Sequence, residues 1–202
     1  RDKQRKIAMK GAKFMAVIGA ILGDIAGSQF EFNRPENLDY KHCELFTNRC
    51  SYTDDTIMTL AVKKAILENA DFTKTMREIG QPYPYSGYGG RFYEWMYGEN
   101  PKPYNSFGNG SAMRVSFVGE HFDALEDVIS MAEKSAEVTH NHPEGIKGAV
   151  VTAVCIWMAR HGKTKEDIFQ YVLEQYPAEK YEYSIAVPLD ELEKIYQWNE
   201  TC

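Results

Sequence analysis

Helical spacing of apolar residues runs through most of the chain. Apolar side chains recur at intervals of three and four over residues 13–30 and 55–69, and this spacing predicts amphipathic helices. The pattern returns after residue 110 and predicts helices over 111–121, 124–137, 143–160, 165–175 and 189–198. Residues 181–187 alone alternate as a strand would. With no repeat and no linker, the sequence predicts a single all-α domain over residues 1–202.

The first predicted helix carries glycine at three positions spaced by four, Gly19, Gly23 and Gly27. Residues four apart share one face of a helix, and a face without side chains lets a neighbouring backbone come close. Glycine lowers helix propensity, so its repetition here predicts tight packing on that face.

Residues 80–110 break the helical pattern with many Pro, Gly and Tyr residues. We expect an irregular segment there, interrupted by a short helix over 92–97. Such segments in compact domains are more often binding loops than spacers. At its end, residues 108–111 (Gly-Asn-Gly-Ser) precede a predicted helix, where free backbone N–H groups can cradle a phosphate. The same turn is also an ordinary loop-to-helix joint, and Phe107 beside it either stacks on a base or fills the core.

Composition excludes several classes of protein. The 202 residues are 44% apolar and 26% charged, as in soluble globular domains, and the net charge of -6 argues against general nucleic-acid binding. Four cysteines without a C-x-x-C pair fit reduced thiols in the cytoplasm. The apolar stretch from Phe14 to Gly23 is too short to span a bilayer. A signal peptide is the alternative interpretation of residues 1–27, although no clean cleavage site follows them.

Tyr52-Thr53-Asp54-Asp55-Thr56 opens the second predicted helix with a hydroxyl and two carboxylates. These are hard oxygen ligands of the kind that Mg²⁺ binds. The same residue types also cap helices, because they accept hydrogen bonds from free N–H groups and complement the helix dipole. A metal site and a simple cap therefore both remain open. Glu31, just past the glycine-rich helix, is either a functional acid or a solvated surface residue.

His140 and His142 lie two residues apart and invite a zinc interpretation. A tetrahedral zinc site needs further His or Cys ligands at recognisable spacing, and the sequence offers none nearby. Pro143 at the first position of a helix, with Asn141 or His142 as its cap, explains the segment structurally. The structural interpretation is therefore favoured over zinc.

Taken together, the ordered blocks resemble the ADP-ribosylglycohydrolase family, which includes the dinitrogenase reductase-activating glycohydrolases. The blocks are Gly23-Asp24-x-x-Gly27-Ser28-x-x-Glu31, Tyr52-Thr53-Asp54-Asp55, Gly87-Tyr88-Gly89, residues 106–114 (Ser-Phe-Gly-Asn-Gly-Ser-Ala-Met-Arg) and Thr139-His140-x-His142. The resemblance implies an all-α orthogonal bundle of many helices. It further implies two Mg²⁺ ions, or Mn²⁺, in a central cleft, and a hydrolase that removes ADP-ribose from modified proteins or small acceptors.

The resemblance also implies a role for each matching position. Thr53, Asp54 and Asp55 are expected as metal ligands, and Glu31 as the acid beside the scissile glycosidic bond. A substrate loop, defined here as Ser106, Phe107, Gly108, Asn109, Gly110 and Ser111, is expected to hold the pyrophosphate and the nearby ribose. His140 is expected to contact ribose or phosphate instead of a metal.

One departure from the family pattern changes the expectation for this chain. The family's remaining metal ligands come from a C-terminal Asp-x-Asp-Thr motif, and nothing after His142 matches it. We therefore expect a C-terminally truncated member with weak or no activity, and self-association through apolar surface that the missing helices would cover. Two alternatives stay open: a non-catalytic ADP-ribose-binding or structural member, and a metal hydrolase acting on another nucleotide-like substrate. The acceptor, whether arginine, serine or a small molecule, is also left open.

Overall fold

Helices joined by irregular segments make up the part of the chain that the computed structural model describes, residues 15–31, 38–39, 42–177 and 180–181. The helices are α2 (Met15–Glu31), α3 (Asp54–Glu68), α4 (Phe72–Gly80), α5 (Gly90–Tyr97), the 3-10 helix η1 (Asn109–Ser111), α6 (Ser116–His121), α7 (Leu125–Glu137), α8 (Pro143–Arg160) and α9 (Lys165–Gln175). These residues contain no strand, so the all-α prediction is confirmed. The predicted helix 189–198 and the predicted strand, apart from Tyr181, lie outside the described residues.

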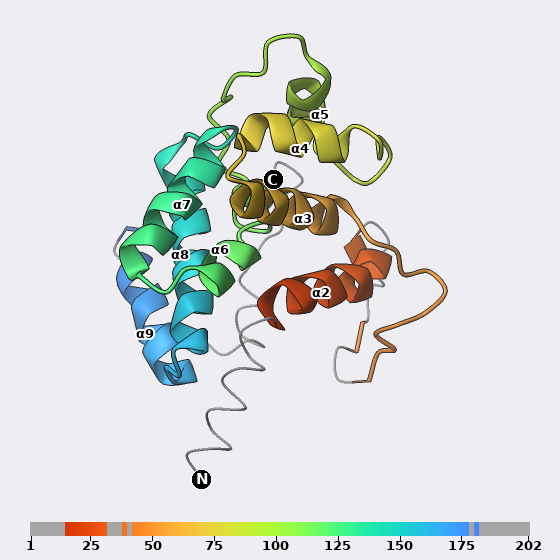
Figure 1. Cartoon of the computed structure of the whole chain (residues 1–202). Coiled ribbons are helices and arrows are strands. Elements are labelled where there is room, and N and C mark those ends of the chain that lie inside the picture. The colour runs from red at the N-terminus through yellow and green to blue at the C-terminus, as the bar shows by residue number, and fades with distance from the viewer. Residues whose placement is uncertain (1–14, 32–37, 40–41, 178–179, 182–202) are drawn as a thin grey trace.

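The helices form two groups joined by α6. In the first group α3 lies between α2 and α4, and α5 packs on α4 (Figure 1). In the second group α8 lies between α7 and α9. Figure 1 shows α2, α3 and α4 running across the view and α8, with α7 and α9 beside it, running up and down, as in an orthogonal bundle. Because α6 contacts α2, α3, α7 and α8, it fixes the two groups relative to each other.

One apolar core extends through both groups. Its fully buried members include Met58, Ala61 and Val62 of α3, Met76 of α4, Met96 of α5, Val118 of α6, Val128 and Ala132 of α7, and Ala149 and Ala153 of α8. Removing this apolar surface from water is the main force that stabilises such a fold. The core therefore holds α3 in place beside α2.

One helix prediction needs correction, and one helix was missed. Residues 111–115 are not part of an α-helix, because η1 ends at Ser111 and α6 begins only at Ser116. The hydroxyl of Ser111 donates to the carbonyl of Gly145 at 2.7 Å, so contacts with α8 override the local helical pattern. Helix α4 was not predicted, although Asp71 caps it by accepting from the N–H of Lys74.

The tight packing predicted for the glycines of α2 is wrong for the described residues. A Cβ atom at Gly19, Gly23 or Gly27 would meet no described atom within 4 Å. The close approach occurs at Gly119 of α6 instead, where a Cβ atom would lie 2.7 Å from Cβ of Ile156 on α8. Neighbouring α2 side chains are also open to solvent: Met15 is 60%, Ile18 49% and Leu22 48% exposed.

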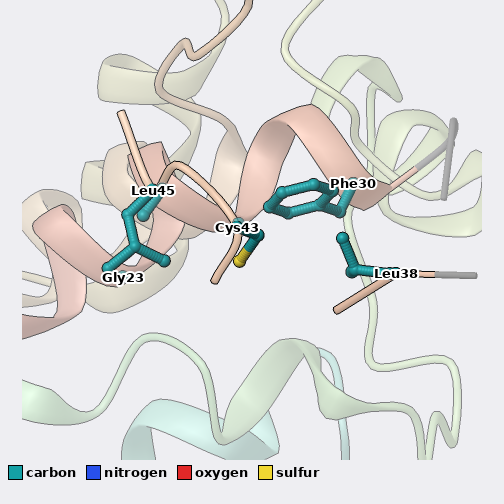
Figure 2. Close-up of a pocket in the computed structure, with 7 residues that line it drawn as sticks. Gly23, Phe30, Leu38, Cys43 and Leu45 are labelled. Carbon is teal, nitrogen blue, oxygen red and sulfur yellow. The ribbon is translucent and has the colours of Figure 1, made fainter. Parts of the chain in front are cut away.

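An open pocket of about 450 Å³ lies along α2 (Figure 2). It is lined by Gly23, Ala26, Gly27 and Phe30 of α2 and by Leu38, Cys43 and Leu45 of the segment that follows. This lining is apolar and includes none of the acidic residues of α2 and α3. Among the described helices, none combines the length and apolar character that crossing a membrane requires.

Candidate active site

Asp24, in the middle of α2, joins this helix to the start of α3. Its Oδ1 accepts a hydrogen bond from the hydroxyl of Thr53 at 2.6 Å, and its Oδ2 accepts from the backbone N–H groups of Thr53 at 2.8 Å and Thr56 at 3.2 Å. The Thr56 hydroxyl also donates to Oδ2. Hydrogen bonds to a charged acceptor are strong, so this carboxylate sets the position of the first turn of α3. The sequence placed Asp24 in a motif without giving it this role.

Thr53 caps α3, as one of the two sequence interpretations predicted. Its backbone is extended, and its Oγ1 accepts from the N–H of Asp55 at 3.3 Å while donating to Asp24. A hydroxyl oxygen has two lone pairs, and this cap uses one of them. Capping therefore leaves room for a metal ion at Thr53, and its role as a ligand stays a prediction.

Asp54 and Asp55, at the start of α3, both bind protons more tightly than usual. Burial, followed by the negative charges of Asp55, Glu31 and Asp24, raises the pKa of Asp54 to about 7. Burial and the charge of Asp24 raise the pKa of Asp55, although the Thr53 hydroxyl opposes this shift. Like charges held together disfavour ionisation, and a bound cation reverses that effect.

The donor chemistry of the junction fits a hard divalent cation. Asp54 and Asp55 offer carboxylate oxygens, and Thr53 adds a hydroxyl, which are the ligand types of Mg²⁺. No group of three His, Cys, Asp or Glu side chains within the described residues is arranged as a metal site. Thr53 and water would therefore complete the coordination shell.

Glu31 lies on the same side of α2 as Asp24, because residues seven apart in a helix share a face. It is the last residue of α2 and is exposed to solvent. Burial of part of the side chain, then the charges of Asp55 and Asp24, raise the pKa of its carboxyl. The structure thus brings Glu31 into the same electrostatic cluster as the predicted metal ligands, while its catalytic role stays a prediction.

The loop before α5 covers Asp54. The carbonyl of Ser86 accepts from the Asp54 N–H at 2.7 Å, and the next residue, Gly87, has a φ of +92°. A Cβ atom at Gly87 would lie 3.3 Å from Oδ1 of Asp54. Both the backbone conformation and the close approach therefore favour glycine here. The opening of this irregular segment contacts the candidate site, although sequence reasoning gave Gly87 no role.

The substrate loop packs on the start of α8. A Cβ atom at Gly145 would lie 2.5 Å from the Ser106 carbonyl oxygen, so the loop approaches α8 closely. Phe107 is 70% exposed, with its ring 5.2 Å from the ring of His142. Phe107 therefore does not fill the core, and the sequence interpretation that placed it there is wrong.

Part of the predicted phosphate cradle is already engaged. The N–H of Gly108 donates to the Ser106 hydroxyl at 3.3 Å. The Asn109 carbonyl accepts from the N–H groups of Ala112 at 2.8 Å and Met113 at 3.0 Å. Binding of an anion by this loop stays a prediction, and it would depend on the remaining N–H groups and on side chains near them.

His140 is buried beside the substrate loop. Its Nδ1 lies 2.7 Å from Oγ1 of Thr139, and a Cβ atom at Gly110 would lie 3.0 Å from both Cε1 and Nε2 of the ring. Burial, followed by the positive charges of Arg114 and Arg91, lowers the pKa of His140 to about 3. The ring is therefore neutral at physiological pH.

His142 caps α8, which confirms the structural interpretation of this segment. Its Nδ1 accepts from the N–H of Glu144 at 3.1 Å, and Pro143 occupies the first turn. The two groups of predicted site residues, the acidic junction and the substrate loop with His140, are linked through the core. The Thr59 hydroxyl of α3 donates to the Met113 carbonyl, just after η1, at 3.3 Å.

The sequence matches a known family along most of its length. The family model for ADP-ribosylglycohydrolase matches residues 11–201. The chain belongs to the ADP-ribosylglycohydrolase family.

Named relatives agree with this assignment. The chain is 30% identical to the ADP-ribosylhydrolase ARH3 of Mus musculus and 29% identical to that of Homo sapiens, in each case over 75% of this chain and 50% of the relative. It is also 23% identical to the putative ADP-ribosyl glycohydrolase L543 of Acanthamoeba polyphaga mimivirus, over 92% of this chain and 67% of the relative. The chain spans about half the length of the ARH3 relatives that it matches.

Proposed function

We propose that this protein removes ADP-ribose from a modified protein side chain or a small acceptor by Mg²⁺-assisted cleavage of the glycosidic bond. The observation that carries the proposal is the acidic junction, where Asp54, Asp55 and Glu31 share one electrostatic cluster anchored by Asp24. Such a cluster favours a divalent cation, and family membership supports ADP-ribose as the substrate.

In this proposal Thr53, Asp54 and Asp55 hold Mg²⁺, with Mn²⁺ as a substitute. When bound, the ion supplies Lewis-acid chemistry by polarising ribose hydroxyls and lowering the pKa of a water. The resemblance to the family implies two such ions in an intact member. Because the described residues offer only three ligand side chains, all at the start of α3, we expect the chain alone to turn over slowly or not at all.

Glu31 is the proposed general acid or base. Its raised pKa lets the carboxyl hold a proton nearer neutral pH than an ordinary glutamate does, and its exposure lets substrate reach it. It can give that proton to the departing atom of the acceptor, or stabilise the positive charge that develops at the anomeric carbon. The substrate loop and His140 bind the pyrophosphate and ribose.

Binding of ADP-ribose to the 202-residue chain tests this proposal. We expect calorimetric titration to show that Mg²⁺ strengthens binding, that Asp55→Asn removes this effect, and that Glu31→Gln leaves it intact. Release of ADP-ribose from an ADP-ribosylated peptide, at whatever rate the chain shows, should disappear in Glu31→Gln. Exposed Glu133 on α7 provides the matched control, since Glu133→Gln should alter neither property.

The other outcomes of this titration identify the alternatives. Binding of ADP-ribose without any effect of Mg²⁺ would favour a non-catalytic sensor or structural member of the family. Failure of ADP-ribose to bind would favour a metal hydrolase for another nucleotide-like substrate. Turnover that persists in Glu31→Gln would remove Glu31 from the mechanism.

We also propose that copies of this chain self-associate through the exposed apolar side of α2. Met15, Ile18 and Leu22 are exposed there, and Leu45 and Phe46 of the following segment are exposed as well. Burying such side chains against a second copy removes apolar surface from water. Light scattering during gel filtration should show a concentration-dependent mass that Leu22→Lys reduces, and a strictly monomeric wild-type chain would refute this.

We also propose, from the cysteines, that the protein acts in the cytoplasm. Cys50 and Cys155 form no disulfide within the described part of the chain, as a reducing compartment favours.

A further inference from the structure

Arg114, between η1 and α6, is fully buried without a carboxylate partner among the described residues. Its Nη2 donates to the carbonyl of Ser135 at 2.6 Å and to Oγ1 of Thr139 at 2.9 Å. A guanidinium only donates hydrogen bonds. The Thr139 oxygen must therefore be the acceptor in this pair, and one of its lone pairs is occupied.

This contact decides the direction of the next hydrogen bond. Thr139 is fully buried, and among the described residues its hydroxyl contacts only Arg114 and His140. If Nδ1–H of His140 donated to Thr139, the hydroxyl proton would have no acceptor. A buried donor without a partner is costly. The Thr139 hydroxyl therefore donates to Nδ1, and the single ring proton of neutral His140 lies on Nε2.

The ring nitrogen that carries this proton lies next to the substrate loop. Nε2 is 3.0 Å from the position of a Cβ atom at Gly110, so the glycine leaves this edge of the ring uncovered by a side chain. The ring of Tyr104, whose backbone N–H donates to the Thr139 carbonyl, also lies near His140, with a centroid distance of 6.1 Å. The hydrogen bond from the Thr139 hydroxyl to Nδ1 thus keeps the ring proton of His140 on Nε2, next to the loop.

We propose that Thr139, oriented by Arg114, is a positioning residue that fixes His140 as its Nε2–H tautomer, so that Nε2 donates to a ribose or phosphate oxygen held in the substrate loop. The identity of that ligand rests on the proposed function. The lowered pKa of His140 supports the same conclusion, because a neutral ring has only one N–H to offer.

Long-range ¹H–¹⁵N NMR of the His140 ring tests the tautomer directly, with the signals assigned by their loss in His140→Asn. At pH 7 and without ligand, we expect Nδ1 to show the shift of an unprotonated nitrogen and Nε2 that of a protonated one. Thr139→Val removes the hydroxyl at nearly constant volume and should give a mixture of tautomers. Thr139→Ser keeps the hydroxyl and should restore the wild-type shifts.

Affinity for ADP-ribose provides the second measurement. Thr139→Val should weaken it about tenfold, as expected for one hydrogen bond, while Thr139→Ser should stay near wild type. A protonated Nδ1 in the wild-type protein would overturn the proposal, and this measurement needs no variant to fold. A Thr139→Val protein with unchanged ring shifts would overturn it as well. The expected tautomer in a protein that does not bind ADP-ribose would count against the proposed function alone.

Discussion

The acidic junction of α2 and α3 and the site around Arg114 and His140 both contain buried ionisable groups. The neighbouring charges are negative at the junction and positive beside His140. At the junction, burial and neighbouring carboxylates raise the pKa of Asp54 to about 7. Beside the substrate loop, burial and two arginines lower the pKa of His140 to about 3. Burial disfavours the charged form in both places, and the neighbouring charges strengthen that preference in both.

The two regions differ in the kind of ligand that each can bind. A cation at the junction would let the carboxylates ionise together, because its charge would offset the burial and the repulsion that now raise their pKa values. At His140 the positive charge is already present in Arg114, and the neutral ring offers an N–H to an oxygen atom. A ligand that carries both ribose hydroxyls and phosphates suits these two regions, and ADP-ribose, the proposed substrate, carries both.

The free energy of unfolding should depend strongly on pH. Asp54 has an ordinary pKa of 3.8, so between about pH 4 and 7 the folded chain holds a proton that the unfolded chain has lost. Raising the pH through this window therefore lowers the free energy of unfolding, by up to about 1.4 kcal/mol per pH unit. For His140 the unfolded ring binds the extra proton between pH 6.5 and about 3, so stability is lost as the pH falls.

Chemical unfolding across pH 4 to 8 separates the two contributions. Asp54→Asn should become more stable relative to the wild-type chain as the pH rises from about 4 to 7. The gap between His140→Asn and the wild-type chain should change below pH 6.5, with the variant losing less stability as the pH falls. Glu133→Gln should stay parallel to the wild-type curve. Parallel curves for all three variants would contradict the comparison.

Most helices could be predicted because their signals are local. The bounds of α8 and α9 match the sequence prediction, since Pro143 and Thr164 mark their starts and the apolar spacing is regular. The prediction for residues 111–115 failed because the hydrogen bond from Ser111 to Gly145 joins residues 34 positions apart. For α4, the local signals that indicate a helix are the capping Asp71 and the helical spacing of Phe72, Met76 and Ile79.

For the candidate site, the sequence could predict the residue types but not the contacts between them. Adjacent Asp54 and Asp55 at a helix start suggested a metal site from local sequence alone. The anchoring role of Asp24 depends on α2 and α3 lying side by side, which the sequence does not specify. The contact from Arg114 to Thr139 likewise spans 25 positions and a buried core. Roles that depend on partners distant in the sequence became visible only in the folded chain.

The smallest effect concerns Gly87, which lies over Asp54 with a positive φ. Gly87→Ala should destabilise the chain by about 1 kcal/mol through backbone strain alone. The new Cβ atom, 3.3 Å from Oδ1 of Asp54, should add a smaller loss and weaken Mg²⁺ binding, because the carboxylate must shift to make room.

Gly162 is the matched control for this substitution. Its φ is +75°, and a Cβ atom there would meet no described atom within 4 Å, so Gly162→Ala carries the strain without the contact. Thermal unfolding of both variants with and without Mg²⁺ therefore isolates the contact with Asp54. If the two variants lose the same stability and respond equally to Mg²⁺, Gly87 serves only the turn, and the acidic junction does not depend on the loop above it.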